Sequence, residues 1–272
     1  MTTKLSNQVL FVTSFAKDMW ESSGKKLLKT FKKYQPNHQL LVCYEKFDFQ
    51  DDDPRILKHN LDQNPFLREW LSNNSDVIPV YLGGKATPEN NPDLFKSYWN
   101  RVASRWFRKV VSMKYARDHY STQFQSIFWV DSDCYFQKTL EDSTFKKVFG
   151  SSNVIYHLGP KRRMANLGVE SGLIGFQGSG GYQFLDLVAH KFRSGLFRKY
   201  HKWDDGFVFR KVIEEILSLN LKLPKNKQII CSDLVKDLNP KKQERSQVIT
   251  YGPFKDFLIH EKGKHKKSKV LD

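Results

Sequence analysis

The chain of 272 residues is long enough for one large domain or two small ones. Its apolar share of 39% supports a folded core and excludes a disordered chain, and no apolar run approaches the ~20 residues needed to span a membrane. Lys and Arg outnumber Asp and Glu by 45 to 29, and the net charge of +16 favours anionic partners, namely nucleic acid, phosphorylated ligands, acidic glycans or membrane surfaces.

The cysteines and the N-terminal residues indicate in which cellular compartment we expect the protein. Cys43, Cys134 and Cys231 are scattered without metal-type spacing, which predicts thiols in a reducing environment. Residues 1–6 carry no apolar signal core. The expectation is a soluble, cytoplasmic protein.

The first 45 residues predict a strand, a helix and a second strand. Residues 9–12 form an apolar run, residues 23–33 carry apolar side chains at helical spacing, and residues 39–45 form another apolar run. A βαβ opening of this length implies a parallel sheet.

Four polar side chains fall where these two strands end. Thr13 and Ser14 follow the first apolar run, and Tyr44 and Glu45 lie at the end of the second. The carboxyl edge of a parallel sheet is where ligands bind, so a nucleotide base could lie on these residues. Equally, they are ordinary loop residues.

The next segment predicts irregular structure before a long helix. Residues 48–54 predict an acidic turn, residues 64–71 a short helix, residues 77–81 an edge strand and residues 83–92 a polar loop. The helical pattern over 93–119 is the longest in the chain.

Basic side chains on this long helix are candidates for phosphate binding. Arg101, Arg105 and Arg108 share one face, for which a solvated basic face is the plainer account, preferred for Arg101. Arg108 and Lys109 lie in the helix that leads to the next strand. Either is suited to a diphosphate, because guanidinium and ammonium are the usual phosphate partners.

The stretch 126–133 carries the sharpest motif. An apolar, aromatic-rich run predicts a buried strand, and Asp131 and Asp133 follow it with Ser132 between them. Two carboxylates at the carboxyl edge of a sheet suit a hard cation of the Mg²⁺ or Mn²⁺ type, which leaves positions open for substrate phosphates. A strand ending in a polar turn is the alternative.

The second half predicts further strands and helices. Residues 145–148 predict part of a helix, residues 154–157 a strand, residues 161–163 a basic loop, residues 166–177 a strand, and residues 178–181 a flexible turn into a helix.

Three acidic residues of this half are candidates for a reaction. Glu170 heads the strand within 166–177 and is able to point into a cleft. Asp204 and Asp205 open a further helix, where capping of the helix N-terminus competes with a functional role. The segment 260–269 is strongly basic and predicts a mobile, solvated end.

Three features in this order resemble a GT-A glycosyltransferase, the metal-dependent class that uses nucleotide sugars. They are the βαβ opening that ends in residues 11–14, the aromatic strand that ends in Asp131-Ser132-Asp133, and the late segment 258–266. The late segment resembles the histidine, glycine and lysine pattern near the C-terminus of glycogenin-like and bacterial galactosyltransferase-like enzymes.

The resemblance implies an α/β fold with a mostly parallel, Rossmann-like central sheet flanked by helices, in a single domain over residues 1–272. Residues 1–135 would form the nucleotide-sugar half, residues 136–260 the acceptor and catalytic half, and residues 261–272 a basic tail.

It also implies a site. Asp131, Asp133 and His260 would hold Mn²⁺ or Mg²⁺, and Gly263 and Lys266 would meet the diphosphate, for which Lys264 or Lys267 is an alternative. The donor-binding set adds Thr13, Ser14, Tyr44, Arg108, Lys109 and Ser132.

The implied reaction moves a sugar from a nucleotide sugar, with UDP as the default nucleotide, to a glycan or other hydroxyl acceptor. In an inverting enzyme Asp205 would take the acceptor proton, whereas in a retaining enzyme Asp205 or Glu170 would stabilise an oxocarbenium-like state, with Asp204 alongside. Both outcomes stay open.

Two other classes of function compete. Nucleotidyl transfer also uses paired aspartates, but it usually shows a glycine- and basic-rich loop after the first strand, where residues 15–18 read Phe-Ala-Lys-Asp. Nucleic-acid binding would explain the charge, but the sequence has no zinc-finger spacing or RNA-binding aromatic motif. Attraction of the enzyme to an anionic surface remains compatible with the charge.

Overall fold

A seven-stranded sheet forms the centre of the protein, in a computed structural model that describes residues 9–75, 102–241 and 248–261. Its strand order is β3-β2-β1-β4-β7-β6-β8. The strands are β1 (Val9–Ala16), β2 (Gln39–Glu45), β3 (Ile56–Asn60), β4 (Ser126–Val130), β6 (Val154–His157), β7 (Glu170–Gln177) and β8 (Cys231–Asp233). Every neighbouring pair is parallel except the two that involve β7. The predicted α/β class with a mostly parallel, Rossmann-like sheet is therefore confirmed.

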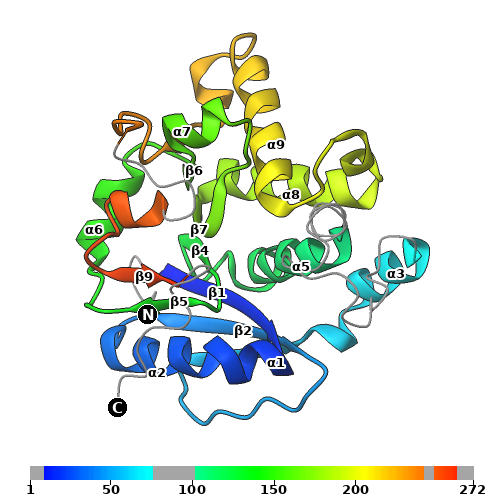
Figure 1. The fold of residues 1–272 in the computed structure, drawn as a ribbon, viewed down its shortest axis with the longest axis vertical. Coiled ribbons are helices and arrows are strands. Elements are labelled where there is room, and N and C mark those ends of the chain that lie inside the picture. The colour runs from blue at the N-terminus through cyan, green and yellow to red at the C-terminus, as the bar shows by residue number, and fades with distance from the viewer. Residues whose placement is uncertain (1–8, 76–101, 242–247, 262–272) are drawn as a thin grey trace.

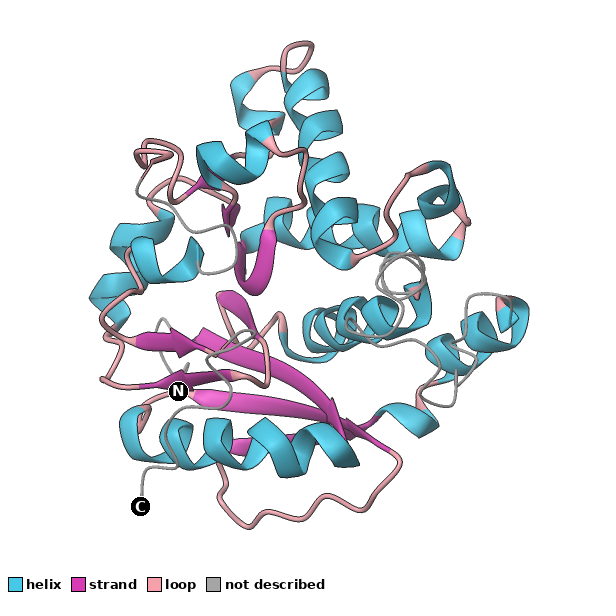
Figure 2. Cartoon of the chain, viewed as in Figure 1, coloured by secondary structure: helices cyan, strands magenta, loops and turns pink. Residues whose placement is uncertain are grey.

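Helices cover both faces of this sheet (Figures 1 and 2). They are α1 (Lys17–Met19), α2 (Lys25–Tyr34), α3 (Pro65–Asn73), α5 (Ala103–Tyr120), α6 (Asp142–Phe149), α7 (Gly159–Met164), α8 (Gly178–Arg193) and α9 (Asp205–Asn220). Over the described ranges, none of the helices combines the length and the apolar character that crossing a membrane requires.

Side-chain alternation along the strands divides the core into two layers. In β4, Ile127 and Trp129 pack with α3, α5, α8 and α9, whereas Phe128 and Val130 pack with α2 and α6. A central strand that is buried on both faces shows the continuous apolar run that predicted it.

A second, two-stranded sheet brings the end of the described chain back to the centre. In it β5 (Cys134–Phe136) pairs antiparallel with β9 (Leu258–His260), and Cys134 lies opposite His260. This pairing sets His260 beside the segment that follows β4.

Several predicted elements agree closely with the structure. The strand over 39–45 has the predicted bounds, and α2, α3, α6 and β6 lie where helices and a strand were predicted. The long helix is described from Ala103 to Tyr120. The predicted strand 77–81 and loop 83–92, together with Arg101, lie outside the described residues.

Three predictions were wrong. The segment 260–269, predicted as a mobile and solvated end, begins with His260, which is buried and belongs to β9. Residues 161–163, predicted as a basic loop, belong to α7, whose start accepts Pro160 and whose basic last turn suits the negative end of the helix dipole. Residues 178–181, predicted as a flexible turn, form the first turn of α8. The sharp change of direction is confined to Gly178, with φ of 63°, and an added side chain at Gly181 would lie 2.7 Å from the carbonyl of Asn153.

Candidate functional site

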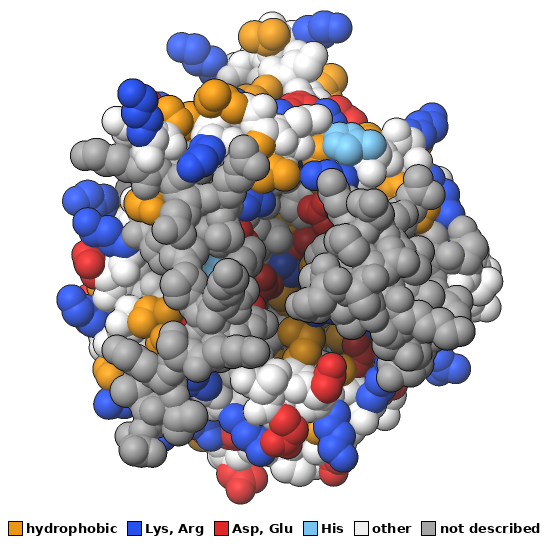
Figure 3. Space-filling view, in the orientation of Figure 1, with side chains coloured by type: hydrophobic (Ala, Val, Ile, Leu, Met, Phe, Trp, Pro, Cys, Tyr) orange, Lys and Arg blue, Asp and Glu red, His pale blue; other side chains and the backbone are white. Residues whose placement is uncertain are grey.

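A cleft of about 600 Å³ opens at the carboxyl ends of β1, β2 and β4. Figure 3 shows it as a hollow with acidic and basic side chains inside. Its lining includes four cationic side chains and six acidic ones: Arg105, Arg108, Lys109, Arg162, Glu45, Asp131, Asp133, Glu170, Asp204 and Asp205. The ligand of such a cleft must carry charge or many polar groups.

Asp131 begins a tight turn directly after β4. Its amide donates to the carbonyl of Gly172 at 2.9 Å, and its own carbonyl accepts from the amide of Cys134 at 2.9 Å. The indole of Trp129, two residues earlier and so on the same face of the strand, donates to the Asp131 carboxylate at 2.6 Å. The turn thus holds Asp131 in a defined orientation at the cleft.

Lys109 joins Asp131 to Asp205. Its ammonium lies 2.8 Å from Asp131 Oδ1 and 2.7 Å from Asp205 Oδ2, and it donates to the carbonyl of Ser171 at 3.1 Å. Burial acts to lower the pKa of Lys109, but the two carboxylates outweigh it and raise the pKa above its ordinary value. We call Lys109, Asp131 and Asp205 the lysine cluster.

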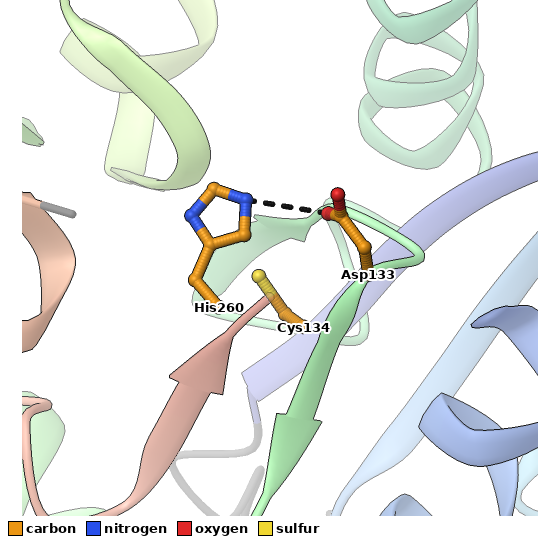
Figure 4. A group of neighbouring side chains, drawn as sticks. All are labelled: Asp133, Cys134 and His260. Carbon is orange, nitrogen blue, oxygen red and sulfur yellow. Dashed lines mark ion pairs between the residues drawn. The ribbon is translucent and has the colours of Figure 1, made fainter. Parts of the chain in front are cut away.

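Asp133 lies in a different environment, beside His260. The distance from His260 Nε2 to Asp133 Oδ1 is 3.2 Å, and Figure 4 shows the imidazole directed at the carboxylate. The His260 side chain is fully buried, and its other ring nitrogen, Nδ1, has no hydrogen-bond partner among the described residues. Gly172 packs against the ring so closely that an added Cβ would lie 2.5 Å from Cε1.

Asp133, Cys134 and His260 form a group whose candidate ligand atoms lie within 4.8 Å of one another. We call this group the histidine cluster. A carboxylate at the cleft and a buried imidazole 3.2 Å from it supply oxygen and nitrogen ligands that fit a divalent cation. Cys134 packs in the apolar core and donates its thiol to the carbonyl of Gly172 at 3.6 Å, so the oxygen and nitrogen atoms are the better ligands for a hard ion.

The two aspartates predicted to share one metal therefore have different neighbours. Asp133 lies with His260, as predicted, whereas the Asp131 carboxylate is directed to Lys109 and Trp129. Lys109, predicted to meet a diphosphate, lines the cleft while bonded to two carboxylates.

Arg108 pairs with Glu45 at the rim of the same cleft. Its Nε donates to Glu45 Oε2 at 2.7 Å and its Nη1 to the carbonyl of Ser104 at 2.7 Å. These bonds orient the guanidinium along the cleft wall. A phosphate group that binds Arg108 would therefore have to compete with the carboxylate of Glu45.

The remaining residues predicted to bind the donor divide into three groups. Ser14 and Ser132 line the cleft. Thr13 is fully buried within the sheet and does not line it, and Tyr44 packs against Phe47 and Phe49. Gly263 and Lys266 lie outside the described residues.

The three predicted catalytic carboxylates all line the cleft. Glu170 is buried, with Arg162 Nη1 at 3.2 Å and the amide of Gly172 at 3.3 Å. Asp204 caps α9 by accepting from the amide of Phe207 at 2.9 Å, and burial, followed by the charge of Asp205, raises the pKa of Asp204. Asp205 belongs to the lysine cluster.

Sequence reasoning missed two contributors. Trp129 was assigned to the core alone, although its spacing from Asp131 could have indicated the contact. Arg162, placed in the supposed basic loop, lines the cleft and bonds to Glu170. No local pattern distinguishes Arg162 from its basic neighbours.

Comparison with known proteins adds no assignment: no protein-family model matches the chain, and no curated protein sequence matches it. The function of the cleft is therefore inferred from its geometry and chemistry.

Proposed function

We propose that the protein is a metal-dependent glycosyltransferase that moves a sugar from a nucleotide diphosphate sugar to a hydroxyl acceptor. One observation carries the proposal: Asp131 and Asp133 lie at the carboxyl edge of a mostly parallel sheet, in a charged cleft, with the buried imidazole of His260 3.2 Å from Asp133. Ligands of open α/β sheets bind at this edge.

Asp133 and His260 are the residues that would hold the cation, with Asp131 next to them. Bound there, a Mn²⁺ or Mg²⁺ ion supplies Lewis-acid stabilisation for the charge that develops on a departing diphosphate. The side chains of Arg108 and Lys109 line the same cleft, where a diphosphate would compete for them with the carboxylates that they already bind.

The end of β1 suits the base of a nucleotide. Phe15 and Met19 line the cleft, and Phe15 stacks on Trp20 with ring centroids 5.3 Å apart. Such an apolar and aromatic wall next to cationic side chains matches a ligand with a flat base at one end and phosphates at the other. UDP is the default nucleotide.

Asp205 is the candidate to act on the acceptor. The ammonium of Lys109, 2.7 Å from Asp205 Oδ2, holds this carboxylate in place at the cleft wall. In an inverting reaction Asp205 accepts the proton of the attacking hydroxyl. In a retaining reaction Asp205 or Glu170 stabilises positive charge on the sugar, so the anomeric configuration of the product decides between the two roles.

Thermal unfolding with a panel of nucleotides tests the proposal. A ligand that binds the folded state alone stabilises it by about 2.7 kcal/mol at a hundred times its Kd. We expect UDP or GDP to raise the unfolding temperature only when Mn²⁺ is present. Asp133→Asn should abolish this shift, whereas Asp237→Asn, at an exposed position, should keep it.

The same panel separates the alternatives. Stabilisation by nucleoside triphosphates and by no diphosphate would favour nucleotidyl transfer. A shift with RNA or DNA and none with any nucleotide would favour nucleic-acid binding. Sugar transfer by Asp133→Asn at the parent rate would exclude the metal site, since loss of a metal's Lewis-acid stabilisation, worth several kcal/mol, should lower the rate by orders of magnitude.

A further inference from the structure

The end of α9 and the turn that follows it expose large apolar side chains. Exposed fractions are 49% for Leu217, 55% for Leu219, 89% for Leu221, 40% for Leu223 and 40% for Ile230. We call residues 217–230 the leucine tip. Hydrophobic and basic side chains gather at this upper end of the molecule (Figures 1 and 3). Several large apolar side chains exposed within one short segment indicate a candidate interaction surface.

The leucine tip is an ordered structure rather than a frayed helix end. The side chain of Asn220 donates to the carbonyl of Ile229 at 2.8 Å and accepts from its amide at 3.2 Å. The side chain of Gln228 donates to the backbone carbonyls of Asn220 and Leu223 at 2.8 and 2.9 Å. These bonds close the turn and keep the leucines outward, so their exposure is part of the fold.

Charge at the leucine tip has one sign. Lys222, Lys225 and Lys227 are exposed, and no Asp or Glu occurs between Glu215 and Asp233. Glu214 and Glu215, at the preceding turn of α9, already pair with Lys211 and Lys191. An anionic surface would therefore meet no like charge across residues 216–232.

We propose that the leucine tip docks onto the surface of an anionic lipid bilayer. Leucines next to lysines match both parts of such an interface, because apolar side chains enter the acyl boundary while ammonium groups meet lipid phosphates. Nucleic acid would use the lysines and leave the leucines in water. The lysines, in turn, would repel one another across a two-fold contact between copies of this chain.

Docking in this way leaves the cleft accessible. Asp205, in the cleft, is the first residue of α9, and the tip begins at its last turn. A helix of 16 residues is roughly 24 Å long, so a membrane at the tip does not cover the residues of the cleft. This surface is independent of the proposed sugar transfer.

Co-sedimentation with vesicles tests the docking. We expect the protein to sediment with vesicles of phosphatidylcholine and phosphatidylserine, and not with phosphatidylcholine alone, and to be released by salt. Leu219→Ser with Leu221→Ser should weaken binding at least tenfold, an order-of-magnitude expectation from the apolar area involved. Replacing Lys222, Lys225 and Lys227 by Glu should weaken it on the order of 100-fold or more, at roughly fivefold per lost positive charge.

A charge-matched variant is the control. Lys29→Glu, Lys33→Glu and Lys146→Glu change the net charge equally on α2 and α6, away from the tip, and should keep most of the binding. Unchanged unfolding temperatures exclude misfolding of the variants. Equal loss in both triple variants would overturn the proposal in favour of a general charge effect. Vesicle binding that survives the leucine variant, or a dimer that this variant dissociates without any vesicle binding, would also overturn it.

Discussion

The lysine cluster and the histidine cluster lie in one cleft and use aspartates only two residues apart, yet their charges are compensated differently. In the lysine cluster, Asp131 and Asp205 share the buried ammonium of Lys109. In the histidine cluster, Asp133 lies 3.2 Å from a buried imidazole whose Nδ1 has no hydrogen-bond partner among the described residues. The lysine cluster contains an ammonium group, whereas the histidine cluster contains a carboxylate and an imidazole, which are the kinds of group that bind divalent cations.

This difference suits the two clusters to different proposed roles in the cleft. A carboxylate that is paired with a buried ammonium group keeps a fixed position, which fits the proposed role of Asp205 toward the acceptor or the sugar. A buried imidazole against Gly172 cannot gain a partner by rotating into water, which suits a site that a metal completes. The predictions that follow are in order of decreasing expected effect. Changes at Lys109, His260 and Asp204 test this division, and acidification tests a buried histidine outside both clusters.

Lys109→Met should have the largest effect. It leaves Asp131 and Asp205 without their cation, and Asp205 is only 2% exposed. Breaking a buried ion pair by removing one partner costs about 3–5 kcal/mol. Chemical denaturation should show a loss of this size in the free energy of unfolding.

The control for Lys109→Met also removes the negative charge of Asp205, which the single variant leaves without a cation. Lys109→Met combined with Asp205→Asn should recover a large part of the loss, because the remaining buried group is neutral. A single variant as stable as the parent would mean that the ammonium does not hold the cluster together.

Acidification should destabilise the protein through a second buried histidine, His157. Burial lowers the pKa of His157 to about 4, against the opposing charges of Asp233 and Glu170. Because its pKa is 6.5 in the unfolded chain, protons bind the unfolded state more strongly. The free energy of unfolding is therefore highest above pH 6.5 and should fall by about 3 kcal/mol as the pH drops toward 4.

A histidine variant isolates this contribution. His157→Gln should flatten the pH dependence between 6.5 and 4 whatever its effect at neutral pH, whereas exposed His190→Gln should keep the parental slope. His59, whose pKa burial also lowers to about 4, with a smaller effect from His119, accounts for part of the remaining slope. An unchanged slope in His157→Gln would assign the whole effect elsewhere.

His260→Gln should remove metal binding at a smaller energetic cost. With Mn²⁺ at a hundred times its Kd, the parent should gain about 2.7 kcal/mol of stability, and the variant should gain almost none. Cys134→Ala should keep the gain, because Mn²⁺ prefers oxygen and nitrogen to sulfur. If Cys134→Ala loses Mn²⁺ binding and His260→Gln keeps it, the assignment of ligands is wrong.

The sequence predicted the half of the site that local pattern determines. Asp131 and Asp133 were found because a strand buried on both faces has a continuous apolar run, and its end shows in the sequence as the first polar residues. The strand 39–45 was found for the same reason. The strands β3, β5 and β8 were not predicted, because they are short or partly polar and are ordered by pairing with neighbours.

Contacts between segments that are distant in the sequence could not be predicted from local sequence patterns. Lys109 meets Asp205 because α5 and α9 pack on the same face of the sheet, and no spacing in the sequence encodes this contact. The position of His260 beside Asp133 depends on the pairing of β5 with β9. It was reached only through the resemblance of the late segment to known enzymes.

Asp204→Ala should have the smallest effect on stability. It separates the capping role of Asp204 from the ion pair that the adjacent Asp205 forms with Lys109. Asp204 accepts from the amide of Phe207, and losing an N-cap costs about 1 kcal/mol. Asp204→Ser should restore most of the stability, because serine also caps, while neither variant disturbs the ion pair between Lys109 and Asp205. Loss of sugar transfer in Asp204→Ser at full stability would give Asp204 a direct part in the reaction. Parental transfer would leave the proposed part to Asp205, whose carboxylate Lys109 holds in place at the edge of the cleft.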